Sequence, residues 1–495
     1  MTGPIAPRGA RPGLGRKAAR GAFVTFGGQG IKIVVQTLSV MLLARRLTPQ
    51  DYGLIAMVVA IIGVGEIFRD FGLSSAAVQA RTLSKEQRDN LFWINAAIGF
   101  TLAAIVFSGA GLIARLYGQP GLAPIARVLC LTFVCNGFAT QYRADLNRRL
   151  LFVRLTVADV TAPAVGLVVA LVLATQGATY WSLVGQQIGQ ALALLVMLAA
   201  GAHWIPGLPH RHADMGRLLR FGTNLVVTQL IGYAGNNVDS LTIGIRLGAG
   251  PLGFYNRAFS LLMTPLTQLR APTTTVALPI LARLSDDDDR YAQFVQRGQL
   301  ALGYTLVAGL AVVISAAEPV TQIFLGSAWT SVTPILRLLA VAGVFQTLAY
   351  VGYWIYLSRG LTRDLMQYSI ITALIKVACI TVGSVWGVVG VAAGYAVAPA
   401  LAWPLSLWWL ARRTSIPMGA LMRGALRIVA VAACAAGAAS VVVQSLAGDD
   451  AFVRLLAALG TAAAVYALAA LTRPVRADLT GVVGILRLAT VRTSR

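Results

Sequence analysis

The chain has 495 residues, of which 57% are hydrophobic and only 12% are charged. Soluble domains are about 25% charged, so this composition excludes a soluble globular protein. The net charge of +23 does not indicate nucleic-acid binding, because the Lys and Arg residues stand in short clusters between apolar runs instead of forming a basic patch. No nucleic-acid partner is therefore expected.

Apolar runs of membrane-spanning length follow one another along the whole chain. A bilayer core of about 30 Å needs about 20 apolar residues in a helix, and this length predicts an all-α integral membrane protein of about fourteen transmembrane helices. The predicted spans are 22–44, 52–68, 90–114, 122–141, 156–176, 180–202, 221–247, 253–282, 297–317, 332–358, 365–384, 387–410, 424–446 and 453–472.

The basic residues alternate along this series of spans. Most of the 41 Lys and Arg residues fall in the N-terminal arm or after even-numbered spans. Cytoplasmic loops of membrane proteins are rich in Lys and Arg, so both termini are predicted to be cytoplasmic, and no cleavable signal peptide is expected. The regions after odd-numbered spans, counted with two residues of the flanking spans, carry only Arg45, Arg46, Arg115, Arg246 and Arg454.

A weak internal repeat divides the spans into two halves. Phe26-Gly27 has a counterpart in Phe221-Gly222, Arg46-Leu47 and Gly53 match Arg246-Leu247 and Gly253, and Tyr52 matches Phe254. Six spans separate the copies, so the halves share their orientation, as in transporters built from parallel repeats. The predicted organisation is a basic arm at 1–21, an N-lobe at 22–202, a loop at 203–220, a C-lobe at 221–410, two further helices at 424–472 and a cytoplasmic tail at 473–495.

Several charged residues lie inside the predicted spans, where a charge is costly unless it faces a cavity or a partner. Lys32 and Lys376 lie near the middle of their spans, and Asp239 lies in the polar sequence Asn-Asn-Val-Asp-Ser. Arg257 and Arg270 share the eighth span, where Pro265 and Pro272 predict a kinked or broken helix.

The second span carries Glu66, with Arg69 and Asp70 on the same helix face. These three residues could form an interfacial ion-pair cluster instead of a functional site, and Arg257 and Arg337 could extend toward the membrane surface.

A cavity rich in Lys and Arg suits an anionic cargo, and pyrophosphate fits such a cavity best because it offers several charge-assisted acceptors. The predicted substrate-binding residues are Lys32, Arg257, Arg270 and Lys376, and the candidates for coupling to a proton or sodium ion are Glu66 and Asp239. The four cysteines and three histidines lack metal-ligand spacing, so neither a metal nor a cofactor is expected.

Residues 220–284, which begin RFGTNLVVTQLIGYAGNNVDS, resemble the central signature of the polysaccharide flippases of the multidrug/oligosaccharidyl-lipid/polysaccharide (MOP) superfamily. Residues 28–57, 71–79 and 180–188 resemble the branch that contains the colanic acid and teichuronic acid exporters. The resemblance covers about residues 22–415. It implies a fold like that of multidrug (MATE) transporters: two six-helix lobes around a central cavity and two additional C-terminal helices.

The resemblance also implies a cargo and a location. The cargo would be an undecaprenyl-diphosphate-linked oligosaccharide, moved across the bacterial inner membrane by alternating access during polysaccharide biosynthesis. Its implied partners are membrane lipid, a polysaccharide polymerase and a chain-length regulator. Cavity charges in relatives lie on the first, second, seventh and eighth helices, which here correspond to Lys32, Glu66, Asp239, Arg257 and Arg270.

Three other functions remain as alternatives. A drug or cation antiporter of the same fold would favour acidic and aromatic residues in its cavity, whereas the interior charges here are mostly basic. A membrane-embedded polymerase or glycosyltransferase would need a large outer loop with catalytic acids, and the loops here are short. A scaffold without transport activity would give the charges in the spans no role.

Overall fold

The computed structural model describes residues 14–70, 84–210, 233, 235 and 237–481. Within these ranges the chain consists of helices and short turns, and no strand occurs. Large apolar side chains lie on outer helix faces, as Phe107 (55% exposed) and Leu112 (70% exposed) do. A lipid-facing surface explains this exposure, because hydrocarbon solvates apolar groups and the helices satisfy their own backbone hydrogen bonds.

Eleven stretches of the described residues are long and apolar enough to cross a membrane. One of them, Thr362–Ala411, contains two helices joined by a short turn, and the eleven do not include the proline-rich helix Ala249–Arg283. The chain is therefore a multi-pass membrane protein, and the count of fourteen spans stays a prediction.

The chain divides into two compact units. The first comprises Met1–Leu47 and Met57–Ala234, and the second comprises Thr48–Ala56 and Gly235–Arg495. The second helix is thus shared, because its first turns belong to the second unit. The lobe boundaries expected from the repeat stay a prediction.

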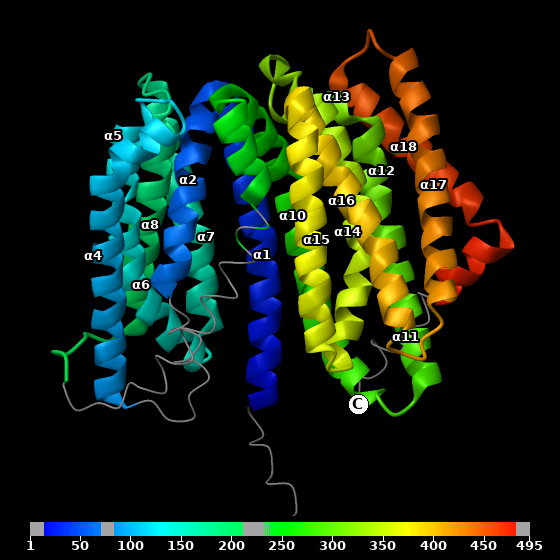
Figure 1. Cartoon of the computed structure of the whole chain (residues 1–495), viewed down its shortest axis with the longest axis horizontal. Coiled ribbons are helices and arrows are strands. Elements are labelled where there is room, and N and C mark those ends of the chain that lie inside the picture. Colours follow the sequence, from blue (N-terminus) through cyan, green and yellow to red (C-terminus); the bar gives the residue numbers. More distant parts are fainter. Residues whose placement is uncertain (1–13, 71–83, 211–232, 234, 236, 482–495) are drawn as a thin grey trace, which may run out of the picture. The chain divides into compact units, whose positions relative to one another are not determined.

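The first unit is a bundle whose core lies among α4, α6, α7 and α8 (Figure 1). Phe92 and Tyr142 are buried there with ring centroids 5.6 Å apart, and Leu155 and Leu198 complete the same core. The helices of this unit are α1 (Leu14–Ala44), α2 (Pro49–Asp70), α4 (Lys85–Leu116), α5 (Leu122–Leu129), α6 (Leu131–Arg148), α7 (Phe152–Thr175) and α8 (Trp181–Ala202).

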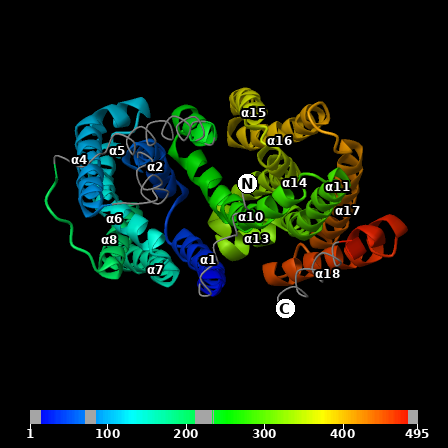
Figure 2. The same cartoon turned by 90° about the horizontal axis from the view of Figure 1, so that it is seen from below.

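The second unit is built around α14, which packs against α10, α12 and α16, and the end-on view shows α17 and α18 at one edge of this unit (Figure 2). Residues 237–246 and 473–481 are also helical. The helices are α10 (Ala249–Arg283), α11 (Asp288–Leu302), α12 (Ala308–Ser315), α13 (Ala317–Phe324), α14 (Val332–Ser358), α15 (Thr362–Gly383), α16 (Gly387–Ala411), α17 (Met418–Ser445) and α18 (Ala451–Ala469), with a π-helical turn at Gly303–Val307 between α11 and α12.

The long helix α10 is continuous although it contains Pro265, Pro272 and Pro279. Of the predicted kinked or broken helix, the break is therefore wrong, and the kink stays a prediction. Threonine hydroxyls supply local hydrogen bonds beside the prolines, as Thr273 donates to the Arg270 carbonyl at 2.6 Å and Thr275 to the Pro272 carbonyl at 2.7 Å. Such side-chain bonds help a proline-containing helix to persist where water is scarce.

The first turns of α2 cross α10 at two glycines. A methyl group at Gly53 would overlap the carbonyl of Ala249, and a methyl group at Gly253 would overlap the carbonyl of Pro49. The two contacts are reciprocal, because each glycine meets the residue one turn before the other glycine. Gly53 and Gly253 were matched in the sequence repeat, so the crossing has the local two-fold relation that the repeat predicts.

An aromatic cluster closes the same crossing. Trp329 is fully buried, and the rings of Tyr52 and Phe254 pack edge-on against it with centroids 5.5 and 5.9 Å away. Tyr52 and Phe254 are also repeat partners. Trp329 thus packs against both members of this repeat pair.

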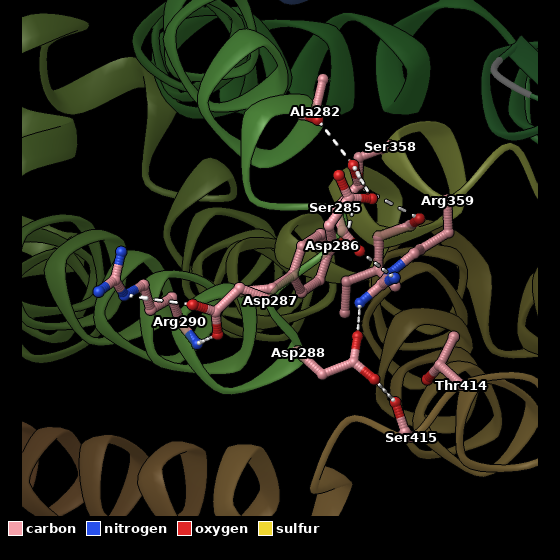
Figure 3. Close-up of polar contacts among 12 residues, drawn as sticks. Ala282, Ser285, Asp286, Asp287, Asp288, Arg290, Ser358, Arg359, Thr414 and Ser415 are labelled. Atoms are coloured by element: carbon pink, nitrogen blue, oxygen red, sulfur yellow. Dashed lines mark hydrogen bonds and ion pairs between the residues drawn. The ribbon is translucent and has the colours of Figure 1, made fainter.

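The acidic run at 286–289 lies near the C-terminal end of α14, where Asp288 contacts two neighbouring segments (Figure 3). Asp288 forms an ion pair with Arg359 and accepts a hydrogen bond from Ser415, while Arg359 donates to the Ser285 carbonyl at 3.0 Å. Asp287 caps α11 by accepting from the backbone N–H of Arg290 at 3.0 Å. Asp288 is solvent-exposed and links the segments that follow α10, α14 and α16.

Candidate functional site

Asp239 is a buried carboxylate in the helical segment 237–246. It is 1% exposed, and its Oδ2 accepts a hydrogen bond of 2.6 Å from the hydroxyl of Tyr255 on α10. Its Oδ1 accepts a hydrogen bond of 2.9 Å from the backbone N–H of Ser240. An ionised acid at this depth requires such donors, because burial without them is costly.

Arg270 extends from the middle of α10 toward α14. It is 7% exposed, it donates to Oε1 of Gln346 at 3.2 Å, and its guanidinium lies 5.5 Å from the centre of the Tyr350 ring. Its Nε is buried without a hydrogen-bond partner among the described residues. Arg270 therefore has unused donor capacity inside the membrane-spanning part of the unit.

Lys376 on α15 lies beside the same side chains. Its ammonium group is 4.7 Å from the centre of the Tyr395 ring, a cation–π contact. The hydroxyl of Tyr395 accepts a hydrogen bond of 3.3 Å from Gln346. No ion pair within 4 Å involves Lys376 in the described part of the chain.

These residues form one connected group, which we call the cationic cluster. Phe259 completes the connection, because its ring packs against both Tyr255 and Tyr395. Two cations and one carboxylate leave a net positive charge, and a buried cation with free donors favours an anionic ligand with several acceptor oxygens. The cationic cluster comprises Asp239, Tyr255, Arg270, Gln346, Lys376 and Tyr395.

Arg257 lies elsewhere on α10. Its guanidinium stacks on Tyr52 with 4.1 Å to the ring centre, and it donates to the side chain of Asn256 at 2.8 Å. Thirteen residues separate it from Arg270, which corresponds to about 20 Å along a helix. Arg257 thus belongs to the α2–α10 crossing and not to the cationic cluster.

Glu66 lies in the first unit and is fully engaged. It forms a 2.6 Å ion pair with Arg69 one turn away, and its other oxygen accepts from Asn136 on α6 at 2.9 Å. Arg69 also donates to Thr140 and to the Asn136 carbonyl. This pattern matches the interfacial ion-pair reading of the sequence, while the side chain of Asp70 lies outside the described residues.

Lys32 is the remaining predicted site residue. It is partly exposed on α1, the helix that packs along α7, and it makes no hydrogen bond or ion pair with a described residue. The structure thus brings Asp239, Arg270 and Lys376 together, and it places Lys32 and Glu66 in the other unit.

Sequence reasoning missed the uncharged members of the cationic cluster. Tyr255, Gln346 and Tyr395 come from three helices, and none of them carries a charge that would mark it in the sequence. The available signal was that a Tyr or Gln in a span needs a hydrogen-bond partner, but the partner depends on helix rotation. The described residues contain no group of three or more His, Cys, Asp or Glu side chains that could hold a metal ion.

The chain is similar in sequence to several bacterial proteins. A protein-family model described as "Polysaccharide biosynthesis protein" matches residues 42–334. The lipopolysaccharide biosynthesis protein WzxC of Escherichia coli K12 is 26% identical over 376 residues, which cover 74% of either chain. The teichuronic acid biosynthesis protein TuaB of Bacillus subtilis 168 is 26% identical over 308 residues, which cover 61% of this chain and 63% of TuaB.

Solved structures show the same fold. The lipid II flippase MurJ in an inward closed conformation has a TM-score of 0.68 at 14% identity, covering 91% of this chain and 99% of MurJ. An inward-facing MATE multidrug transporter of the MOP superfamily has a TM-score of 0.53 at 18% identity, covering 81% and 95%. The predicted MATE-like, all-helical membrane fold is confirmed. Because the family model covers more than half of its length, the chain belongs to the family of polysaccharide biosynthesis proteins.

Proposed function

We propose that this protein is a flippase for undecaprenyl-diphosphate-linked oligosaccharides in polysaccharide biosynthesis. The observation that carries the proposal is the cationic cluster, in which buried Arg270 and half-buried Lys376 leave an excess of positive charge. A diphosphate offers several charged acceptor oxygens to such donors. Membership of the polysaccharide biosynthesis family and a fold shared with a lipid II flippase support the same cargo class.

The proposed mechanism is alternating access around a fixed headgroup site. Arg270 and Lys376 bind the diphosphate, and Lys32 is kept as a proposed substrate-binding residue. Arg257 and Glu66 act through their contacts in this scheme: Arg257 supports the α2–α10 crossing through Tyr52, and Glu66 holds α2 to α6. Both are positioning residues in the proposal.

The alternative functions fit these contacts less well. A cation antiporter needs a site of negative charge, whereas the single acid of the cationic cluster is outnumbered by Arg270 and Lys376. A polymerase or glycosyltransferase needs acids facing water, whereas Asp239 is 1% exposed. A transporter without enzymatic activity is the function that remains.

We further propose the bacterial inner membrane as the location, with both termini in the cytoplasm. The distribution of Lys and Arg supports this orientation. A polysaccharide polymerase and a chain-length regulator are proposed as partners, because a flipped repeat unit must be polymerised on the far side of the membrane.

Deletion of the gene in its native host tests the proposed function. Lipid-linked oligosaccharide is expected to accumulate in the cytoplasmic leaflet, and export of the polymer is expected to stop. Mass spectrometry of extracted lipids and immunoblotting of the surface polymer measure the two effects, and a plasmid copy of the gene serves as the control. Normal polymer export in the deletion strain would refute the proposal.

Asp239 is proposed to couple transport to an ion gradient, because it is the carboxylate of the cationic cluster and its charge sets the net charge of that cluster. Asp239→Asn keeps the shape of the side chain and removes its charge. In proteoliposomes, transport by this variant is expected to lose its dependence on an imposed proton or sodium gradient. The assay follows a fluorescent lipid-linked oligosaccharide, and a gradient dependence equal to that of the unmodified protein would exclude Asp239 from coupling.

A further inference from the structure

A polar cavity lies in the second unit, away from the cationic cluster. It has a volume of about 200 Å³ and is lined by residues of α12, α13, α14, α17 and α18. All of its lining residues lie near helix ends: Arg337 follows the start of α14 at Val332, and Arg454 follows the start of α18 at Ala451. Figure 1 shows α13 and the loop between α17 and α18 at the same upper end of this unit.

Arg454 is the buried charge of this cavity. It is 5% exposed, and its terminal nitrogens donate to the Glu318 carboxylate at 3.0 and 3.4 Å. Its Nε is buried and has no hydrogen-bond partner among the described residues. A guanidinium carries five N–H donors, so Glu318 satisfies only part of this one.

Arg337 is the second cation of the cavity. It is exposed, and its Nε donates to the Ile314 carbonyl at the end of α12, at 3.1 Å. This bond orients the guanidinium and leaves its terminal nitrogens free of any described partner. Two arginines and one glutamate give the lining a net charge of +1, and Gln444 and Ser440 add further polar groups.

We propose that this cavity binds the phosphate group of an anionic molecule, held by Arg337 and Arg454 at the end of the unit where α14 and α18 begin. Arginine forks match phosphate oxygens in geometry. The volume equals that of several liquid waters at roughly 30 Å³ each, which suffices for a phosphate and its neighbouring atoms. The position at helix ends corresponds to the level of lipid headgroups.

The cavity is distinct from the cationic cluster. Arg337 and Gln346 are nine residues apart on α14, which separates them by about 14 Å along the helix axis. The proposal therefore does not depend on the flippase function. Two sources of the phosphate, a lipid headgroup and the free ion, are distinguished by experiment.

The test measures the thermal unfolding midpoint of the full chain in a neutral detergent during titration. One arm adds phosphatidylglycerol and the other adds sodium phosphate, against sodium chloride at equal ionic strength. Arg337→Gln is expected to raise the Kd of the stabilising ligand at least about tenfold. This is the typical effect of losing one charge-assisted hydrogen bond. Arg423→Gln is the matched control, because exposed Arg423 also donates its Nε to one carbonyl, that of Gly419 at 3.3 Å.

Glu318→Gln separates a binding role from a purely structural ion pair. This change leaves Arg454 buried without its anion, so the midpoint is expected to fall in the absence of ligand. A phosphate ligand should then bind several-fold more tightly than in the unmodified protein, because it no longer competes with the carboxylate. A response to phosphatidylglycerol alone assigns the site to lipid, and a response to sodium phosphate assigns it to the free ion. No response to either ligand, or equal effects of the Arg337 and Arg423 changes, would overturn the proposal.

Discussion

Arg270→Ala is expected to abolish polymer export while the protein remains at its normal level in the membrane. Arg270 has one side-chain hydrogen bond, to Gln346, and a buried Nε without a described partner. Its removal therefore leaves no carboxylate without its counter-charge, and stability should change little. The diphosphate would lose at least two charge-assisted hydrogen bonds, which lowers affinity by at least about 100-fold.

The measurement is complementation of the deletion strain, with surface polymer and membrane protein quantified by immunoblotting. Arg283→Ala is the control, because Arg283 lies on the same helix but is exposed. Arg270→Lys keeps the charge without the fork and should retain partial export. Lys32→Ala in the same assay tests whether Lys32, in the first unit, also contributes to export. Full export by Arg270→Ala would exclude the cationic cluster as the headgroup site.

The charged members of this cluster could be predicted from sequence because each interrupts an apolar span. Asp239, Arg270 and Lys376 are conspicuous for that reason, and the structure brings them together. Arg257 meets the same criterion but contacts Tyr52 instead. Sequence gives the depth of a residue in the membrane, whereas its neighbours depend on helix rotation and packing.

Residues near helix ends were harder to interpret. Arg454 appeared as an isolated charge at the start of the last span, and Arg337 appeared to extend toward the membrane surface, yet both line one cavity. Asp288 is solvent-exposed and pairs with Arg359, more than 70 positions away. Such pairings depend on which helix ends meet, and no local periodicity encodes that.

The internal repeat behaved differently, because a close helix crossing leaves a trace in the sequence. Only glycine allows two backbones to approach as α2 and α10 do, so Gly53 and Gly253 recur at matched positions. The aromatic partners Tyr52 and Phe254 recur beside them for the same reason, since both pack on Trp329. The matched residues of the repeat thus meet at one helix crossing, a contact that the repeat by itself did not predict.

Gly253→Ala is expected to destabilise the protein, whereas Gly250→Ala in the same helix is expected to change its stability little. The new methyl group at Gly253 would overlap the Pro49 carbonyl, which belongs to the backbone and cannot rotate away. Overpacking of this kind costs about 1–3 kcal/mol. Nothing lies within 4 Å of the position that a methyl group would take at Gly250. The helix preference of Ala over Gly is offset there, because Pro251 follows and disfavours a helical residue with a Cβ before it.

Thermal unfolding of the purified variants in detergent measures the stability of each. Equal midpoints for Gly253→Ala and Gly250→Ala would show that the crossing is not tightly packed. The reciprocal variant Gly53→Ala should resemble Gly253→Ala, because its methyl group meets the Ala249 carbonyl. The double variant is expected to lose less stability than the sum of the single losses, since one methyl group already separates the helices. Export should fall in parallel, because Arg257 and Tyr52 depend on the same crossing. If the two stability losses add fully, the two methyl groups act on separate contacts and do not share one increase in the distance between the helices.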